Sequence, residues 1–247
     1  GRRHAIFFPA PARISTPPLS FLVFFTFAAK TAMPISVEKF TFNPFSENTY
    51  VLHDDTGECI IIDPGCYEPH EKIELSQFII NNNLRPVRLL NTHCHIDHVF
   101  GNKFVADTWS LPLEIHEGEL PVLEALPEIS RYFGIPLQEP SPMPGKFIRE
   151  GDLIEFGNSK LEVLFTPGHS PASLSFFCRE DRFVIAGDVL FYGSIGRTDL
   201  PGGDYDTLIS SIKTQLFPLG DDVKIYSGHG ADTSIGFERK HNPFLIS

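Results

Sequence analysis

A short stretch of the chain, residues 93–98, carries three histidines and one aspartate. Imidazole nitrogen and carboxylate oxygen are ligand atoms that zinc, iron and manganese take in proteins. In an extended segment alternate side chains share a face, so His93 and His95 can bind one metal ion. If a helix begins at Asp97, the side chains of Asp97 and His98 turn towards a second ion. The stretch therefore predicts a metal site, with a histidine-rich surface loop as the alternative.

Three further loops each place a glycine and then a ligand-type side chain after an apolar segment. These side chains are His169, Asp188 and His229. Glycine lets the backbone turn sharply or approach another group closely. Together with the four side chains at 93–98, they make seven candidate ligands. Seven are too many for one tetrahedral ion and suit two, and an aspartate between two ions can bridge them.

The segments that must position these residues have alternating strand-like and helix-like patterns. Apolar alternation predicts strands at 35–42, 49–53, 58–62, 87–91, 113–116, 153–156, 161–166, 173–178, 183–186 and 223–226. Amphipathic spacing predicts helices at 69–82, 98–108, 118–133 and 206–217, with Ile73, Leu75, Phe78 and Ile79 as apolar positions of the first. Asp63, at the end of one strand, is either a turn cap or an acceptor that fixes the tautomer of an imidazole ligand.

Composition bounds the class of protein. The 247 residues suit one large domain or two small ones, and 42% hydrophobic residues are enough for a sizeable core. The net charge of −11 repels phosphate backbones and argues against nucleic acid as the main partner. The four cysteines form neither a CxxC metal site nor a disulfide framework, which indicates reduced thiols in a cytosolic protein. Cys94 lies between two candidate ligands, and we interpret it as a packing residue.

Residues 1–32 differ from the rest of the chain. A basic start and a proline-rich stretch precede an apolar run at 19–29. That run is too short to span a bilayer, which needs about 20 apolar residues. We interpret Met33 as the natural start of one domain that covers 33–247, and 1–32 as an extension from upstream of it. An export signal in this extension is the alternative.

The ligand pattern resembles the metal-binding signature of the metallo-β-lactamase fold superfamily, in its glyoxalase II-like branch. The segments 193–204 and 238–244 also resemble short glyoxalase II-like hydrolases. The resemblance implies an α+β fold of four layers, an αββα sandwich, with the metals at one edge. It implies one zinc site made by His93, His95 and His169, and a second made by Asp97, His98 and His229. Asp188 and a hydroxide would bridge the two ions.

This resemblance implies a metal-dependent hydrolase with Asp97 and Asp188 as catalytic residues. Two divalent ions are expected, zinc first, with iron or manganese as alternatives. The expected partner is a small-molecule thioester of the hydroxyacyl-glutathione kind, and neither nucleic acid nor a membrane is expected. A thiolate leaves without a proton, since thiols have a pKa of about 8.5, so no strong general acid is needed. The helical domain with which glyoxalase II holds glutathione has no counterpart after His229, so glutathione recognition does not follow.

Other activities of the same superfamily stay open. β-Lactamases usually carry cysteine at the position of Asp188, which argues against β-lactam hydrolysis. Persulfide dioxygenases bind one iron through a set like His93, His169 and Asp188, and share a motif like residues 196–199. Ribonuclease branches are disfavoured by the acidic charge. A non-catalytic binding module is disfavoured because seven ionisable groups without a metal would reduce stability.

Three side chains outside the ligand set have two interpretations each. Tyr192 either lines the substrate pocket or packs in the core. Arg239 and Lys240 either meet a substrate carboxylate or are ordinary surface charges.

Overall fold

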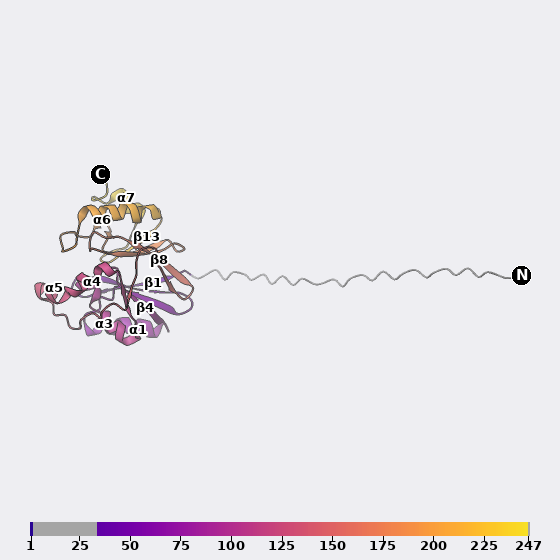
Figure 1. Ribbon diagram of the computed structural model, residues 1–247, viewed down its shortest axis with the longest axis horizontal. Coiled ribbons are helices and arrows are strands. Elements are labelled where there is room, and N and C mark those ends of the chain that lie inside the picture. The colour runs from indigo at the N-terminus through magenta and orange to yellow at the C-terminus, as the bar shows by residue number, and fades with distance from the viewer. Residues whose placement is uncertain (2–33, 247) are drawn as a thin grey trace. The chain divides into compact units, whose positions relative to one another are not determined.

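The computed structural model describes residue 1 and residues 34–246. The extension expected at 1–32 and the start expected at Met33 lie outside the described residues, apart from Gly1, so that boundary stays a prediction. Within 34–246 the strands form two six-stranded sheets and one two-stranded ribbon, with helices on the outer faces (Figure 1). Among these residues no helix has the length and apolarity that a membrane span requires.

The first sheet has the order β1-β2-β3-β4-β5-β6. Its strands are β1 (Ser36–Phe42), β2 (Glu47–His53), β3 (Glu58–Ile62), β4 (Arg85–Leu90), β5 (Leu113–Ile115) and β6 (Lys146–Phe147). The first three pair antiparallel and the last four pair parallel. Parallel neighbours need a crossover connection. Helix α1 (Pro69–Asn81) lies in the connection from β3 to β4, and α3 (Asn102–Trp109) in the connection from β4 to β5.

The second sheet has the order β14-β13-β10-β9-β8-β7. Its strands in chain order are β7 (Leu153–Phe156), β8 (Ser159–Phe165), β9 (Leu174–Cys178), β10 (Phe183–Gly187), β13 (Lys224–Ser227) and β14 (Thr233–Ser234). Only β10 and β13 pair parallel, and their connection contains the ribbon β11 (Leu190–Phe191) and β12 (Ser194–Ile195) and helix α6 (Tyr205–Ser211). Helix α7 (Ile235–His241) follows β14.

Alternation along the strands builds the layers. In β2, Leu52 packs between the two sheets, in a cluster that includes Phe176 of β9, whereas the next residue back, Val51, packs under α1. Phe177 packs on the other face of the second sheet, with Leu208 of α6. Figure 1 shows α1 and α3 on one outer side and α6 and α7 on the other. The predicted four-layer αββα sandwich is therefore confirmed.

The helix predicted at 98–108 is wrong as a single element. The chain forms α2 (Ile96–Val99) and then α3, with Gly101 between them. The Gly101 N–H donates to the carbonyl oxygen of Pro64 at 2.7 Å. A Cβ at Gly101 would lie 2.4 Å from Cys66 Sγ, so only glycine fits. The close approach of the turn after β3 breaks the helix at this point.

The helix predicted at 118–133 also divides. It comprises a 3₁₀ turn (Glu117–Glu119), α4 (Leu120–Glu124) and α5 (Leu126–Phe133). A proline lies in the first turn of each α-helix, where its missing N–H is not needed. The helix predicted at 206–217 ends as α6 at Ser211 and continues as a π-helical turn and a 3₁₀ turn.

Helix α1 packs most of the apolar positions predicted for it against the first sheet, but not Ile73. Ile73 is 55% exposed, while Leu75 and Ile79 are buried together with Glu71. The Glu71 carboxylate accepts hydrogen bonds from the backbone N–H groups of Asn43 and Tyr67, both at 2.7 Å. A charged residue therefore holds the start of α1 against neighbouring loops, which the pattern of apolar residues does not indicate.

Candidate metal centre

The loop between β4 and α2 carries the first candidate ligands. His95 precedes the helix with extended backbone angles, φ −65° and ψ 152°, and α2 begins at Ile96. The chain is thus extended up to His95 and turns one residue before the predicted helix start at Asp97. This change separates the directions of the side chains before and after it.

His93, His95 and His169 form a first group. One nitrogen from each ring lies within 4.8 Å of the others. His95 Nδ1 is 2.9 Å from His169 Nε2, and the ring centroids of His93 and His169 are 4.9 Å apart. Three imidazole nitrogens so close together suit three corners of a tetrahedral ion.

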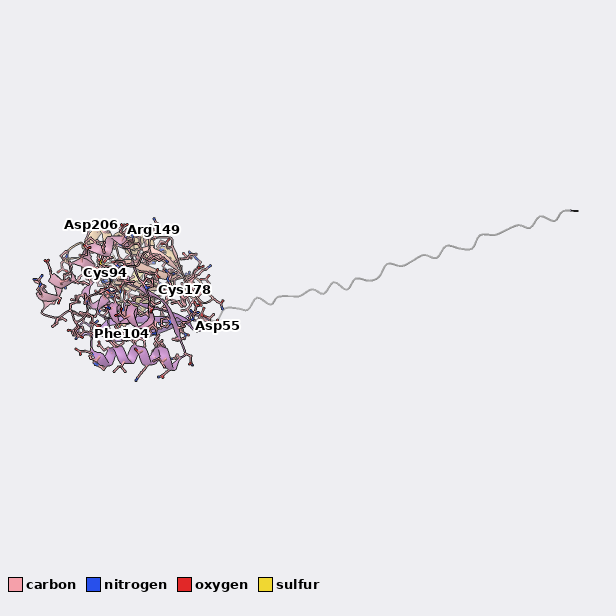
Figure 2. All side chains as sticks on the ribbon, turned by 60° about the horizontal axis from the view of Figure 1, so that its bottom comes forward. Asp55, Cys94, Phe104, Arg149, Cys178 and Asp206 are labelled. Atoms are coloured by element: carbon pink, nitrogen blue, oxygen red, sulfur yellow. The ribbon has the colours of Figure 1, made fainter. Side chains whose placement is uncertain are left out.

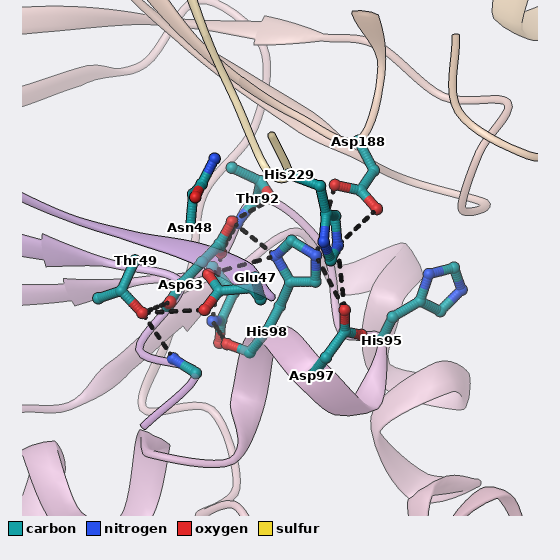
Figure 3. Close-up of polar contacts among 12 residues, drawn as sticks. Glu47, Asn48, Thr49, Asp63, Thr92, His95, Asp97, His98, Asp188 and His229 are labelled. Carbon is teal, nitrogen blue, oxygen red and sulfur yellow. Dashed lines mark hydrogen bonds and ion pairs between the residues drawn. The ribbon is translucent and has the colours of Figure 1, made fainter. Parts of the chain in front are cut away.

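Asp97, His98 and His229 form a second group, also with ligand atoms within 4.8 Å of one another. His229 Nε2 is 3.1 Å and His98 Nε2 is 3.7 Å from Asp97 Oδ2. The three side chains come from α2 and from the loop after β13, which are far apart in sequence. Figure 3 shows them turned towards one another.

Asp188 lies between the two groups, in the loop after β10. Its Oδ1 is 3.4 Å from His98 Nε2, and its Oδ2 is 3.4 Å from His169 Nε2 and 3.5 Å from His229 Nε2. The Asp188 carboxylate packs against the backbone of Gly228. Any other residue at 228 would clash with it, because a Cβ there would lie 2.1 Å from Asp188 Oδ1. The fold therefore brings together all seven side chains named from the sequence; their role as metal ligands stays a prediction.

Buried atoms without partners show whether metal ions fit. His93 Nε2, His98 Nε2 and Asp188 Oδ1 are buried and have no hydrogen-bond partner. A buried polar atom without a partner is costly and rare in native proteins. These three atoms point into the space that the two groups surround. Cations bound there would supply the missing interactions, so the donor set fits two metal ions.

Asp63 orients two of the imidazoles through their Nδ1 atoms, one directly and one through Thr92. Its Oδ2 lies 3.1 Å from His98 Nδ1 and accepts a hydrogen bond from Thr92 Oγ1 at 2.6 Å. Thr92 Oγ1 in turn lies 3.0 Å from His93 Nδ1. Of the two interpretations of Asp63, the acceptor role agrees with this geometry (Figure 3). Protons on both Nδ1 atoms leave both Nε2 lone pairs free for a metal.

Backbone carbonyls fix two more tautomers. His169 Nδ1 lies 2.7 Å from the oxygen of Arg197, and His229 Nδ1 lies 3.1 Å from the oxygen of Phe45. Each Nε2 then faces the site. The ring of His95 has the opposite orientation, since its Nδ1, and not its Nε2, faces His169.

Glu119 links the loops of the first group and has no counterpart in the sequence predictions. Its carboxylate is fully buried and accepts hydrogen bonds from Cys94 N at 2.9 Å and Ala172 N at 2.8 Å. Ser170 Oγ donates to it at 2.6 Å. One side chain of the 3₁₀ turn thus joins the residues beside His93 and His95 to those beside His169. In the sequence it is an ordinary helix glutamate.

Glu47 is a second buried carboxyl group that the sequence does not indicate. Its Oε1 has no hydrogen-bond partner and lies 3.9 Å from His98 Nδ1, and Thr49 Oγ1 donates to Oε2 at 2.9 Å. Burial raises the pKa of Glu47 well above its usual value. Burial therefore favours the uncharged form of this carboxyl group beside the second group.

Charges in the centre favour cation binding. Burial and the neighbouring His98 lower the pKa of His93, and burial and His169 lower the pKa of His95 to about 3. Burial acts to raise the pKa of Asp97 and of Asp188, but the adjacent histidines outweigh it and both values fall below the usual range. Two ionised carboxylates thus face the neutral imidazoles of His93 and His95. Burial acts to lower the pKa of His98 and of His229, but the carboxylates of Asp97 and Asp188 outweigh it and raise both values, so a bound cation would take the place of protons on these two rings.

A pocket of about 1100 Å³ opens beside the centre. Five candidate ligands lie along it: His95, Asp97, His169, Asp188 and His229. Helices α4 and α5 form one wall, with Val122, Ala125, Ile129 and Phe133. The loop after β12 brings Arg197 and Asp199 to the opening.

The other side chains named from the sequence lie elsewhere. Cys94, labelled in Figure 2, is buried in the apolar cluster under the first sheet, as expected for a packing residue. Tyr192 is 59% exposed and stacks on Phe237, so it neither lines the pocket nor packs in the core. Arg239 pairs with Asp221 and donates to the oxygen of Phe217, and it is not among the pocket residues.

Comparison with known proteins gives a consistent result. A family model described as the metallo-beta-lactamase superfamily matches residues 42–229. Hydroxyacylglutathione hydrolase GloC of Haemophilus influenzae is 38% identical over 218 residues, which cover 86% of this chain and 99% of that protein.

Solved structures agree with this family. BLEG-1, described as a B3 metallo-beta-lactamase, superposes with a TM-score of 0.78 and 36% identity, over 86% of this chain and 100% of that one. TTHA1623 in a di-iron-bound form has a TM-score of 0.76 and 36% identity, over 85% and 100%. ETHE1 from Myxococcus xanthus has a TM-score of 0.68 and 25% identity, over 84% and 83%.

Proposed function

The chain belongs to the metallo-beta-lactamase superfamily, and from this premise we propose a two-metal hydrolase that cleaves a thioester of the hydroxyacyl-glutathione kind. Asp188 carries the proposal, because its carboxylate lies within 3.5 Å of histidines from both groups. The ions proposed are zinc, and the partner is a small molecule, neither nucleic acid nor a membrane. The name of the Haemophilus relative supports the thioester.

The protein's residues supply binding and orientation. When bound, two divalent ions would polarise a carbonyl and lower the pKa of water from 15.7 to about 7. Asp97 and Asp188, whose pKa values are low, can accept hydrogen bonds from water at the floor of the pocket and orient it. The apolar wall of α4 and α5 excludes bulk water from the other side. A leaving thiolate, with a thiol pKa of about 8.5, needs no proton from the protein.

A persulfide dioxygenase with one iron is the second candidate. His93, His169 and Asp188 offer two imidazoles and one carboxylate, a donor set that non-haem iron oxygenases use. The likeness to ETHE1 supports this candidate, whereas the di-iron-bound form of TTHA1623 holds two ions. A single iron gives no role to the second group, Asp97, His98 and His229, although the fold brings these three side chains together. The hydrolase is therefore the better-supported proposal.

Elemental analysis with an activity panel tests the proposal. We expect two zinc ions per chain and turnover of thioesters without oxygen uptake. His95→Ala and Asp188→Ala should each lose metal and turnover together. One iron per chain with oxygen consumption on a persulfide would favour the second candidate, and full turnover by both variants would reject the assigned centre.

The cysteines support a reducing compartment, and we propose the cytosol. All four are free and buried. Structural disulfides form in oxidising compartments, and small exported proteins often depend on them. Location by microscopy or by cell fractionation of the full chain tests this proposal.

A further inference from the structure

We infer that the pocket selects thioesters through an uncharged apolar group and offers no free cation to an anionic thiol. This inference rests on the proposed thioesterase activity and revises the thiol part of its substrate: it keeps the thioester and replaces glutathione by an uncharged, apolar group. It concerns the residues that line the pocket beyond the candidate ligands.

The wall of the pocket is built for apolar contact. Helices α4 and α5 present Val122, Ile129 and Phe133 to the pocket. Phe133 packs edge-on against Phe45 of the first sheet's connecting loop, with ring centroids 5.9 Å apart. Phe191 of β11 lies on the pocket as well, beside the second metal group, with its ring centroid 6.2 Å from that of His229. With the carbonyl of a thioester at the candidate metal centre, the acyl or thiol group next to it would therefore contact these apolar side chains.

Histidines aside, the pocket lining carries more acidic than basic side chains. Apart from the histidines, Arg197 is the one cationic residue among the described residues of the lining. Asp199 already binds it with two hydrogen bonds, Arg197 Nε to Oδ1 at 2.7 Å and Nη2 to Oδ2 at 2.8 Å. Glu128 adds a further carboxylate to the lining. No lining cation is left for a substrate carboxylate.

Glutathione and apolar thiols are therefore expected to behave differently. Glutathione carries two carboxylates, and neither would find an unpaired cationic side chain in this lining beyond the candidate metal ligands. Burying a carboxylate without a partner is strongly unfavourable. Burying a methylene is favourable and corresponds to about a fourfold gain in binding. We expect kcat/KM to increase with the size of the apolar group that faces α5.

Two thioester series test this inference. In one the acyl chain lengthens from acetyl to hexanoyl on N-acetylcysteamine, a neutral thiol; in the other an alkyl thiol lengthens on a constant acetyl group. We expect kcat/KM to rise by several-fold per methylene in at least one series. Flat values in both series, together with faster turnover of lactoyl-glutathione, would overturn the inference and leave the hydrolase intact. No turnover of any thioester by the metal-loaded protein would instead reject the proposed function.

A charge variant gives a sharper test. Asp199→Asn releases the guanidinium of Arg197, so the ratio of kcat/KM for lactoyl-glutathione to that for the neutral thioester should rise about fivefold, the effect of an exposed ion pair. The matched control is Asp222→Asn, which removes the same charge from Arg182, a pair with the same two-bond geometry at 2.8 Å and outside the pocket lining. The control should keep the parent ratio. An unchanged ratio in Asp199→Asn would overturn the assignment of a neutralised cation.

A substitution in the wall tests the apolar part separately. Ile129→Asn should flatten the response to chain length, with metal content measured on the same sample to show that the centre is intact. Ile73→Asn, on the exposed face of α1, is the control and should keep the response. An unchanged chain-length response in Ile129→Asn would count against α5 as the selecting wall.

Discussion

On the scale of a single residue, Asp63 orients two imidazoles at once, one directly and one through Thr92. Its φ of +49° is tolerated by asparagine, so Asp63→Asn keeps the backbone and removes the charge. We expect metal affinity to fall by about 10- to 100-fold, the usual effect of losing such an outer partner. Competition with a zinc chelator measures it.

The control for Asp63 is a second turn carboxylate far from the centre. Asp54→Asn removes the same charge from a buried aspartate that contacts Thr56 and Asn158 instead of a ligand. Its metal affinity should equal that of the parent protein. Equal affinities for both variants would show that Asp63 has only the turn role.

Glu119 carries the next prediction, because its carboxylate joins the two loops of the first metal group. Glu119→Gln places an amide N–H against backbone donors, so part of this junction is lost. We expect the metal at His93, His95 and His169 to bind about 10- to 100-fold more weakly. Metal content and the visible spectrum of the cobalt-substituted protein should show this loss.

A comparable buried glutamate serves as the control for Glu119. Glu114 of β5 is also buried, and Arg88 donates to it at 2.8 Å. Glu114→Gln should lower stability without changing the metal content. If Glu114→Gln and Glu119→Gln lose metal to the same extent, Glu119 has no special influence on the centre.

At this scale the sequence named the seven side chains that the fold brings together, but not the residues that support them. The ligands are of a few residue types and follow glycines or strand ends, a pattern visible locally. Glu119 and Glu47 act through residues 25 or more positions away, such as Cys94 and His98. No local pattern distinguishes them from surface glutamates. Only the packing of the two sheets shows which carboxyl groups are buried.

On the scale of elements, Asp54 connects the two sheets. It lies in the turn between β2 and β3 and accepts hydrogen bonds from Asn158 N at 2.6 Å, in the turn between β7 and β8, and from Ser159 Oγ at 2.9 Å, at the start of β8. Burial acts to raise the pKa of Asp54, but these bonds and those from Thr56 outweigh it and lower the pKa. The carboxylate therefore stabilises the fold only while it is ionised.

The pH dependence of this stabilisation can be predicted. A group whose folded pKa is lowered contributes its full stabilisation above its unfolded pKa of about 3.9 and loses it as the pH falls through the folded value. Asp54→Asn should reduce the free energy of unfolding by about 1–2 kcal/mol at pH 6. The difference should shrink below about pH 4. Denaturant unfolding of the metal-free proteins at pH 6 and pH 3 measures it, and a constant difference would contradict the assignment.

Strands were predicted better than helices, for a physical reason. Strands such as β3, β9 and β10 are buried on both faces and appear as continuous apolar runs. Helix ends depend on contacts between distant segments, as at Gly101 with Pro64. Helix α7 was not predicted, and it includes Glu238, a buried carboxylate that accepts hydrogen bonds from Thr233 and Asn242. Such polar anchoring leaves no apolar periodicity to recognise.

On the scale of the whole molecule, the candidate metal centre lies where the two sheets meet at one edge. Its side chains come from loops after β4 in the first sheet and after β8, β10 and β13 in the second. Bound ions would therefore tie the two halves of the sandwich together. Without them, buried atoms such as His93 Nε2 and Asp188 Oδ1 keep no partner. Metal binding should consequently stabilise the entire fold.

Removal of the metal tests this coupling. An ion that binds only the folded state stabilises it by about 2.7 kcal/mol at 100 times its dissociation constant. For a domain of this size that corresponds to a rise in Tm of about 5–10 °C. Thermal unfolding of the chelator-treated protein, with and without added zinc, measures the shift. His93→Ala with Asp97→Asn removes a ligand from each group, so this double variant should show little response to zinc. Equal Tm values for the parent protein with and without metal would mean that the two sheets close at this edge without help from any ion.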